Sequence, residues 1–313
     1  MHGERDAKIK SGIYRIGDSS ALYPAAGDFV LIRYNESGES LIVKTLERKS
    51  KFSRSDFSGH AAGYVKTVTE QVIAANFDYV FIMASMNMDF DIRRLERYLA
   101  LSWNSGGMPV IVLTKSDLAG DCKEFIYKAE KIAAGIPVFA VSSKTGEGID
   151  KIKSFLSPGK TVVFLGSSGV GKSSLVNALA GGELMKVREI REDDSRGRHT
   201  TTHRQLIMLD SGVMIIDTPG MREVGMWDAG EGISETFVDV EDLFSACRFS
   251  DCSHTSEPGC AVRKAIESGE LDESRWKSYV SLKREERFTA DKSAYLRKKE
   301  QFFKRISKMS KKK

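Results

Sequence analysis

The stretch that decides the fold is Gly166-Ser-Ser-Gly-Val-Gly-Lys-Ser173, which fits the phosphate-binding pattern G-x-x-x-x-G-K-[ST]. An apolar run, residues 161–165 (TVVFL), precedes it, and a helix-forming run, residues 173–180 (SSLVNALA), follows it. Glycines let backbone N–H groups turn inward around phosphate oxygens, and the helix N-terminus adds a favourable dipole. The pattern therefore predicts a phosphate site at Gly166, Ser167, Ser168, Gly169, Val170, Gly171, Lys172, Ser173 and Ser174.

Within this motif, Lys172 should bridge the β- and γ-phosphates while Ser173 coordinates Mg²⁺. Two further segments belong to the same predicted site. Asp217-Thr-Pro-Gly220 follows an apolar strand, so Asp217 should reach Mg²⁺ and Gly220 should offer a backbone N–H to the γ-phosphate. Residues 196–204 (RGRHTTTHR) lie between the two motifs, in the switch I position. One of the threonines 200–202 should complete the Mg²⁺ shell; the spacing does not choose among them, and we assign Thr201.

The position that usually orients the attacking water does not hold a suitable residue in this sequence. Met221 follows the second motif where many GTPases place a glutamine, and a thioether cannot orient water. We name His199 as the catalytic residue beside Lys172, with His203 as second choice. Slow hydrolysis that requires a partner follows as a hypothesis.

A base-recognition site is predicted from two other loops. Thr114-Lys-Ser-Asp117 resembles the guanine-specificity motif [NT]-K-x-D of GTPases, in which the carboxylate accepts both N1–H and the exocyclic amine of guanine. Adenine lacks this donor pair, so it would leave the carboxylate unpaired. Ser142-Ser-Lys144 resembles the companion loop whose backbone N–H contacts guanine O6. The predicted guanine site consists of Thr114, Lys115, Ser116, Asp117, Ser142, Ser143 and Lys144.

The order of the motifs predicts a circularly permuted GTPase domain. From about residue 72 apolar strands alternate with helical spacing, which indicates about six mostly parallel strands in a doubly wound sheet with helices on both faces. The guanine loops at 114 and 142 precede the phosphate motifs at 166 and 217, whereas ordinary GTPases have the reverse order. The segment after Asp217 therefore runs directly into the C-terminal region.

The residues on either side of this domain have a different character. Residues 10–70 are β-rich, with strands expected at 29–34 and 41–46, and suggest a small barrel or sandwich. After about residue 231 the apolar β runs stop, and residues 272–288 and 293–307 are typical of helices. We expect three domains, at 1–70, 71–230 and 231–313.

A structural zinc site is predicted in the third domain. Cys247, Cys252, His254 and Cys260 offer three thiolates and one imidazole, a soft tetrahedral set without an open position. The segment has too few apolar residues to fold by burial alone, so metal binding should stabilise it. Cys122 stands apart and is expected to be a small apolar residue.

Charge is distributed unevenly along the 313 residues. The net charge is +5, yet residues 291–313 carry ten basic and two acidic side chains, so the rest of the chain is at −3. A basic end favours contact with a polyanion. No window of 18 uninterrupted apolar residues occurs and the first ten residues lack an apolar signal region, so we expect a cytoplasmic protein without membrane contact.

Together, GSSGVGKSS, GRHTTTHR, DTPGMRE and CRFSDCSHTSEPGCAV in the permuted order closely resemble the bacterial small-ribosomal-subunit-dependent GTPase family (RsgA, also called YjeQ), over about residues 20–290. The resemblance implies an N-terminal OB-fold, a permuted GTPase core and a C-terminal zinc domain with helices. It also implies a monomer that binds the small (30S) subunit and 16S rRNA and hydrolyses GTP to GDP and phosphate, stimulated by the subunit during late maturation.

The same resemblance implies contacts to 16S rRNA in the N-terminal OB domain and in the zinc domain. Arg48, Lys49, Lys51 and Arg54 form a basic segment suited to that role. Only about twenty residues precede the AAGDF segment (25–29), so we expect the first barrel strand to be missing or shortened. Two other functions remain open: a regulatory GTPase with a protein effector, and a GTP-gated RNA- or protein-binding switch with little hydrolysis of its own.

Overall fold

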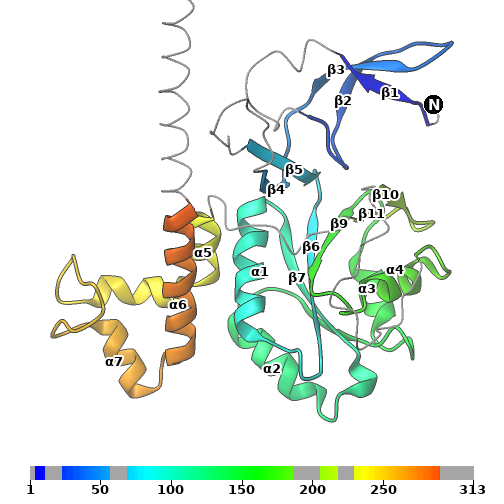
Figure 1. Ribbon diagram of the computed structural model, residues 1–313. Helices are drawn as coiled ribbons and strands as arrows, with labels where there is room; N and C mark the ends of the chain where they lie inside the picture. The colour runs from blue at the N-terminus through cyan, green and yellow to red at the C-terminus, as the bar shows by residue number, and fades with distance from the viewer. Residues whose placement is uncertain (1–3, 11–22, 57–68, 186–204, 218–228, 290–313) are drawn as a thin grey trace, which may run out of the picture.

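The structure is a computed structural model that describes residues 4–10, 23–56, 69–185, 205–217 and 229–289 (Figure 1). Its centre is a six-stranded sheet with the strand order β10-β11-β9-β6-β7-β8. Neighbouring strands are parallel except for β10 and β11, which form an antiparallel pair. The strands are β6 (Tyr79–Ser85), β7 (Met108–Thr114), β8 (Val138–Val141), β9 (Thr161–Gly166), β10 (Gln205–Met208) and β11 (Met214–Asp217). The predicted sheet is confirmed.

Helices cover both faces of this sheet because its central strands are apolar on both sides. In β6, Val80 and Ile82 belong to one buried cluster and Phe81 and Met83 to the other, as successive residues of a strand point to opposite faces. The first cluster lies beneath α1 (Ile92–Ser105) and α2 (Cys122–Ile132). The second lies beneath α3 (Ile149–Phe155) and α4 (Lys172–Ala180).

Local sequence signals set the ends of α1, the helix beside the guanine and phosphate loops. The Asp91 side chain caps its first turn by accepting hydrogen bonds from the backbone N–H groups of Arg93 and Arg94. The helix ends at Gly106, which has a φ of 82° and occupies the left-handed region that favours glycine. Leu95 and Leu99, one helical turn apart, are buried against the sheet.

The N-terminal region consists of two small sheets. The strands β1 (Ala7–Ile9), β2 (Val30–Arg33) and β3 (Ser40–Thr45) pair in the order β1-β3-β2, and β4 (Lys51–Asp56) pairs with β5 (Thr69–Ala75) in a separate ribbon. Among the described residues these sheets do not close into a barrel, so the expected barrel is not confirmed. A three-residue strand, β1, does precede the AAGDF segment.

The basic segment after β3 is engaged with neighbouring acidic and polar side chains. Both Arg48 nitrogens Nε and Nη2 lie 2.7 Å from the Asp28 carboxylate, whose side chain is 1% exposed. Lys51 pairs with Glu70, and Arg54 donates to Gln71. Arg48 therefore holds the N-terminal region together, and Lys49 and Lys51 are the exposed members of the expected RNA-binding set.

The C-terminal region is helical. It comprises α5 (Gly230–Thr236), α6 (Val238–Glu241), the short helix Asp242–Ala246, α7 (Ala261–Ser268) and a helix over residues 273–289, which confirms the expected helix at 272–288. The second expected helix, at 293–307, lies outside the described residues. Gly232 of α5 packs so closely on α1 that an added Cβ would lie 2.0 Å from the Ala100 carbonyl oxygen.

A buried ionic network fastens the last described helix to α1. The Arg275 guanidinium is buried and lies 2.8 Å from Glu96 of α1 and 2.6 Å from Asp239 of α6. It also donates to the Thr236 carbonyl oxygen. Burial raises the pKa of Glu96, although its hydrogen bonds with Ser278 and Arg275 act in the opposite direction. Removing Arg275 would leave the buried Glu96 without its charged partner, which costs about 3–5 kcal/mol.

Candidate functional site

The predicted nucleotide loops all follow the carboxyl ends of strands in the central sheet. The phosphate loop follows β9, the Thr114–Asp117 loop follows β7, the Ser142–Lys144 loop follows β8, and Asp217 ends β11. Carboxyl ends of parallel strands meet at one edge of a sheet, which is where open α/β sheets bind ligands. The sheet order therefore brings together motifs that the permutation separates in the chain.

The phosphate loop has the geometry that its glycines require. Gly169 and Gly171 have φ angles of 73° and 103°, in the left-handed region. A Cβ on Gly166 would lie 3.0 Å from the Met83 carbonyl oxygen, so the loop passes close to β6. The helix α4 begins at Lys172, directly after Gly171, which directs its first backbone N–H groups toward the loop.

The cation and the carboxylate predicted for phosphate and Mg²⁺ lie in contact. Lys172 Nζ lies 2.5 Å from Asp217 Oδ1, although 45 residues separate them in the chain. Ser173 and Ser174 follow Lys172 in the first turn of α4. Lys172 and Asp217 therefore meet at the end of the phosphate loop.

Two side chains hold the phosphate loop in place, and sequence reasoning missed one of them, Asp89. Asp89, which precedes α1, accepts a hydrogen bond from the Ser167 hydroxyl at 3.0 Å and pairs with Arg94 at 3.1 Å. Thr114 was expected in the guanine loop, but its hydroxyl donates to the Val170 carbonyl oxygen at 2.6 Å. The guanine and phosphate loops are therefore joined directly. No sequence pattern signals either contact, because each depends on the packing of neighbouring strands.

The guanine loops also contact each other. The buried Ser142 hydroxyl donates to Asp117 Oδ1 at 2.7 Å and accepts from the backbone N–H groups of Lys144 and Thr145. The Ser116 hydroxyl donates to Glu147, a second residue that the sequence did not identify. Asp117 is thus held in one orientation by the loop that is expected to contact guanine O6.

Part of the predicted site lies outside the described residues. This part contains the γ-phosphate residue Gly220, the switch I threonines 200–202 and both histidines named for water activation, 199 and 203. Met221 lies there as well.

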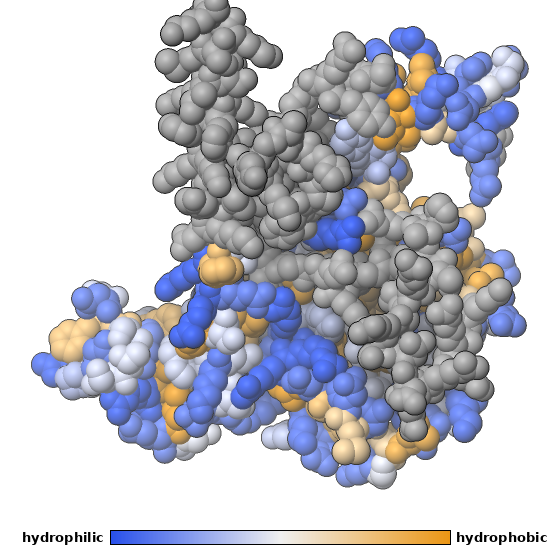
Figure 2. Space-filling model, in the orientation of Figure 1, coloured by the Kyte–Doolittle hydropathy of each residue, from blue (hydrophilic) through white to orange (hydrophobic). Residues whose placement is uncertain are grey.

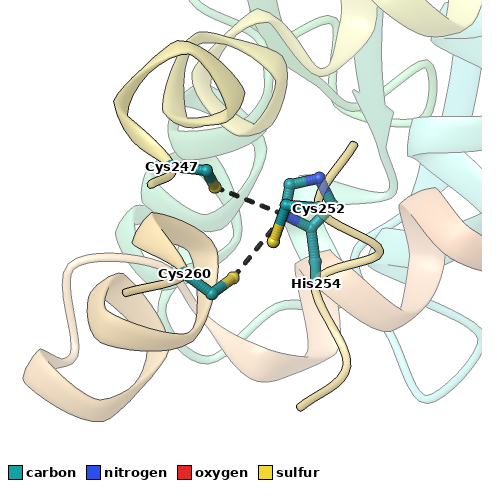
Figure 3. A group of neighbouring side chains, drawn as sticks. All are labelled: Cys247, Cys252, His254 and Cys260. Atoms are coloured by element: carbon teal, nitrogen blue, oxygen red, sulfur yellow. Dashed lines mark hydrogen bonds between the residues drawn. The ribbon is translucent and has the colours of Figure 1, made fainter. Parts of the chain in front are cut away.

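The four predicted metal ligands form one cluster in the C-terminal region (Figure 3). The ligand atoms of Cys247, Cys252, His254 and Cys260 all lie within 4.8 Å of one another. His254 Nδ1 lies 3.5 Å from Cys247 Sγ and 3.6 Å from Cys260 Sγ. A tetrahedral ion bound at about 2.3 Å to sulfur and about 2.0 Å to nitrogen separates such atoms by about 3.5 Å. This cluster could hold a metal ion through Nδ1 of the imidazole.

The pKa shifts of the cysteine and histidine side chains in the cluster are also compatible with a bound cation. Burial tends to raise the pKa of the Cys247 thiol, but the backbone N–H groups of Ala261 and Val262 outweigh it, so the net shift is downward. Burial and the neighbouring thiols raise the pKa of Cys252 to about 11. Burial lowers the pKa of His254, which keeps its imidazole neutral and able to bind a metal. Thiolates so close together repel one another unless a cation lies between them.

Surrounding side chains fix the loop that carries two of these ligands. The Glu257 carboxylate accepts hydrogen bonds from the backbone N–H groups of Ser253, Thr255 and Ser256. The Ser253 hydroxyl and the backbone N–H groups of Glu257 itself, Ser253 and Ser256 lower the pKa of Glu257 to about 2. The His254 ring stacks on Phe244 with centroids 4.3 Å apart. The loop is therefore organised by its own side chains around the ligand atoms.

Comparison with known proteins identifies relatives with these features. A family model described as RsgA GTPase matches residues 45–227. A curated relative, small ribosomal subunit biogenesis GTPase RsgA 1 of Listeria innocua, is 47% identical over 294 residues, which cover 94% of this chain and 81% of the relative. The corresponding RsgA of Streptomyces avermitilis is 46% identical over 307 residues, covering 94% and 80%.

Two solved structures agree with this assignment. The crystal structure of YjeQ from Thermotoga maritima matches with a TM-score of 0.63 and 30% identity, over 88% of this chain and 87% of that one. YloQ, described as a circularly permuted GTPase, matches with a TM-score of 0.59 and 27% identity, over 91% and 87%. Within the described residues, no helix is both long enough and apolar enough to cross a bilayer. From its motifs, its sheet and these relatives, the chain belongs to the RsgA GTPase family.

Proposed function

We propose that this protein is a GTPase that acts in the biogenesis of the small ribosomal subunit, binding the subunit and hydrolysing GTP to GDP and phosphate. The observation that carries the proposal is the direct contact among the guanine loops, the phosphate loop and Asp217 at one edge of the sheet. The relatives named small ribosomal subunit biogenesis GTPase align with this chain over about four-fifths of their own length.

The side chains divide the reaction among them. Water attacks the γ-phosphorus, the bond from that phosphorus to the β–γ bridging oxygen breaks, and the electron pair leaves on the β-phosphate of GDP. Lys172 neutralises charge that develops on the β- and γ-phosphate oxygens. When GTP binds, Lys172 therefore gives up its ion pair with Asp217 and contacts the phosphates instead. Ser173, Asp217 and one switch I threonine, assigned as Thr201, would hold Mg²⁺, which neutralises charge on the same oxygens when bound.

Water activation is assigned to His199. Its imidazole can accept a proton or a hydrogen bond near neutral pH, which the thioether of Met221 cannot do. Both residues lie outside the described part of the chain. A site that lacks the usual glutamine would hydrolyse GTP slowly until a partner positions the histidine that replaces it.

Zinc is the proposed metal of the cysteine cluster. Three thiolates and one imidazole at tetrahedral spacing suit Zn²⁺ and leave no position open for a substrate, so the site is structural. Zinc would bind Cys247, Cys252 and Cys260 through sulfur and His254 through Nδ1. Its place beside the helix over 273–289 suggests that it stabilises the docked C-terminal region.

The proposed RNA partner is 16S rRNA, and the N-terminal strands are one proposed contact region. We assign them to an OB-type domain, whose exposed ring at Phe29 offers a stacking face for a base. Lys49 adds an exposed positive charge to this region. The protein is proposed to act as a monomer in the cytoplasm, where small subunits are assembled.

Co-sedimentation with purified small subunits tests the proposed partner. We expect the protein to sediment with the subunits in the presence of a non-hydrolysable GTP analogue and to be released with GDP. Large subunits at the same concentration serve as the control. Absence from the small-subunit pellet in both nucleotide states would favour a regulatory GTPase with a protein effector instead.

A further inference from the structure

A polar groove of about 280 Å³ lies between α1 and the helix over residues 273–289. On the α1 side it is lined by Arg93, Arg94 and Arg97, and on the other side by Lys277 and the Ser281 hydroxyl. Figure 2 shows hydrophilic surface over the region where these helices face each other. The groove thus combines four positive charges with a neutral hydrogen-bond donor.

The two carboxylates in the groove are already committed to other groups. Asp91 caps α1 through the backbone N–H groups of Arg93 and Arg94. Glu285 forms a two-point ion pair with Arg97. Arg93 is exposed and has no side-chain partner within the described ranges, and Lys277 makes only an exposed pair with Glu273, which is worth little. The groove therefore has an excess of available positive charge.

We propose that this groove binds the phosphate backbone of RNA and, through Arg94, links that contact to the phosphate loop. The inference rests on the proposed function, because the small subunit supplies the RNA. Guanidinium groups match phosphate oxygens with two parallel hydrogen bonds, and arginines on one helix face can follow a backbone. A ribosomal protein with an acidic segment is the other possible occupant, and the experiment below separates the two.

The walls of the groove are held rigidly enough to form a site. The buried Arg275 fastens one helix to Glu96 of α1 at 2.8 Å. Arg97 and Glu285 form a second link between the same two helices. A bound phosphate therefore meets a prearranged pair of helices, which reduces the entropy lost on binding.

A short chain of contacts leads from the groove to the nucleotide site. Arg94 lines the groove and also lies 3.1 Å from Asp89 Oδ2, which accepts the Ser167 hydroxyl at 3.0 Å. A phosphate in the groove competes with Asp89 for Arg94. The charge on Asp89, beside the phosphate loop, is then less neutralised, so RNA contact changes the electrostatics of the loop that holds GTP.

The test compares two double variants that lose equal charge. Arg93→Gln with Lys277→Gln removes two groove charges, and Lys151→Gln with Lys153→Gln removes two exposed charges from α3 on the opposite face of the sheet. Affinity for small subunits and for protein-free small-subunit rRNA is measured over a series of salt concentrations with a GTP analogue. The hydrolysis rate at saturating subunit is divided by the rate of the same variant without subunits.

We expect the groove variant to lose about one unit of the log–log salt slope per phosphate contact removed, on both subunits and free rRNA. Its stimulation ratio should also fall below that of the α3 variant. Equal slopes for the two variants would contradict RNA binding in the groove. A change seen with subunits but not with free rRNA would show that a ribosomal protein occupies the groove. An equal stimulation ratio would overturn the link through Arg94. If the unmodified protein binds neither particle nor rRNA, the proposed function itself fails.

Discussion

Asp117→Asn should exchange the preference of the nucleotide site from guanine to xanthine. The carboxylate accepts two N–H groups of guanine, and Ser142 orients it by donating to Oδ1 at 2.7 Å. An amide keeps one acceptor oxygen but presents its NH₂ to the second donor, so two hydrogen bonds to a charged group, worth about 1.5–3 kcal/mol each, are replaced by one neutral bond and one donor–donor contact. This corresponds to a loss of about 10²- to 10⁴-fold in GTP affinity. Xanthine carries a carbonyl oxygen where guanine carries its amine, and that oxygen can accept from the new NH₂.

Equilibrium binding of labelled GTP and xanthosine triphosphate measures this change. Asp121→Asn is the matched control, because Asp121 lies four residues away and caps α2 by accepting the Lys123 backbone N–H. It should retain the guanine preference. Unchanged GTP affinity in the Asp117→Asn protein would show that base recognition lies elsewhere.

Cys252→Ser should remove most of the bound zinc. Four ligands share a binding free energy of about 10–16 kcal/mol in structural zinc sites, so one lost thiolate weakens affinity by about 10²- to 10³-fold. The effect should extend beyond the loop, because the His254 ring contacts Trp276 of the helix over 273–289. We therefore expect greater protease sensitivity and altered tryptophan fluorescence in the C-terminal region.

Elemental analysis of purified protein checks the zinc assignment, with Cys122→Ser as the control. Cys122 is a free cysteine outside the cluster, and its thiol contacts the Ser116 carbonyl oxygen. That variant should keep one zinc per chain. A full complement of zinc in the Cys252→Ser protein would contradict the four-ligand assignment.

The sequence predicted the central sheet because its physical signals are local. Strands such as β6 are buried on both faces and therefore form continuous apolar runs, and the phosphate loop needs glycines at fixed positions. The cysteine cluster was predicted for the same reason, since its ligands lie within fourteen residues.

The contacts that organise the site could not be predicted because they join distant parts of the chain. Glu96 and Arg275 are 179 residues apart, and only the fold brings them together. The Asp89 contact with Ser167 spans 78 residues. Arg48 is a further example, because its pairing with Asp28, twenty residues earlier, could not be predicted from the basic run that contains it.

The permutation has a structural consequence for signalling. The segment after Asp217 leads into α5, and α5 packs on α1, to which Arg275 also fastens the last described helix. We expect a change in switch II to reach the C-terminal region across α1. Communication between GTP and the basic end of the chain would pass through this helix.

The most direct measurement of the proposed function is the GTP hydrolysis rate of the purified protein with and without small ribosomal subunits. We predict a slow rate alone and a rate that rises with subunit concentration to saturation, with no response to large subunits. His199→Ala should bind GTP and subunits but lose the stimulated rate. An unmodified protein that hydrolyses GTP equally fast with and without small subunits would contradict a subunit-dependent GTPase.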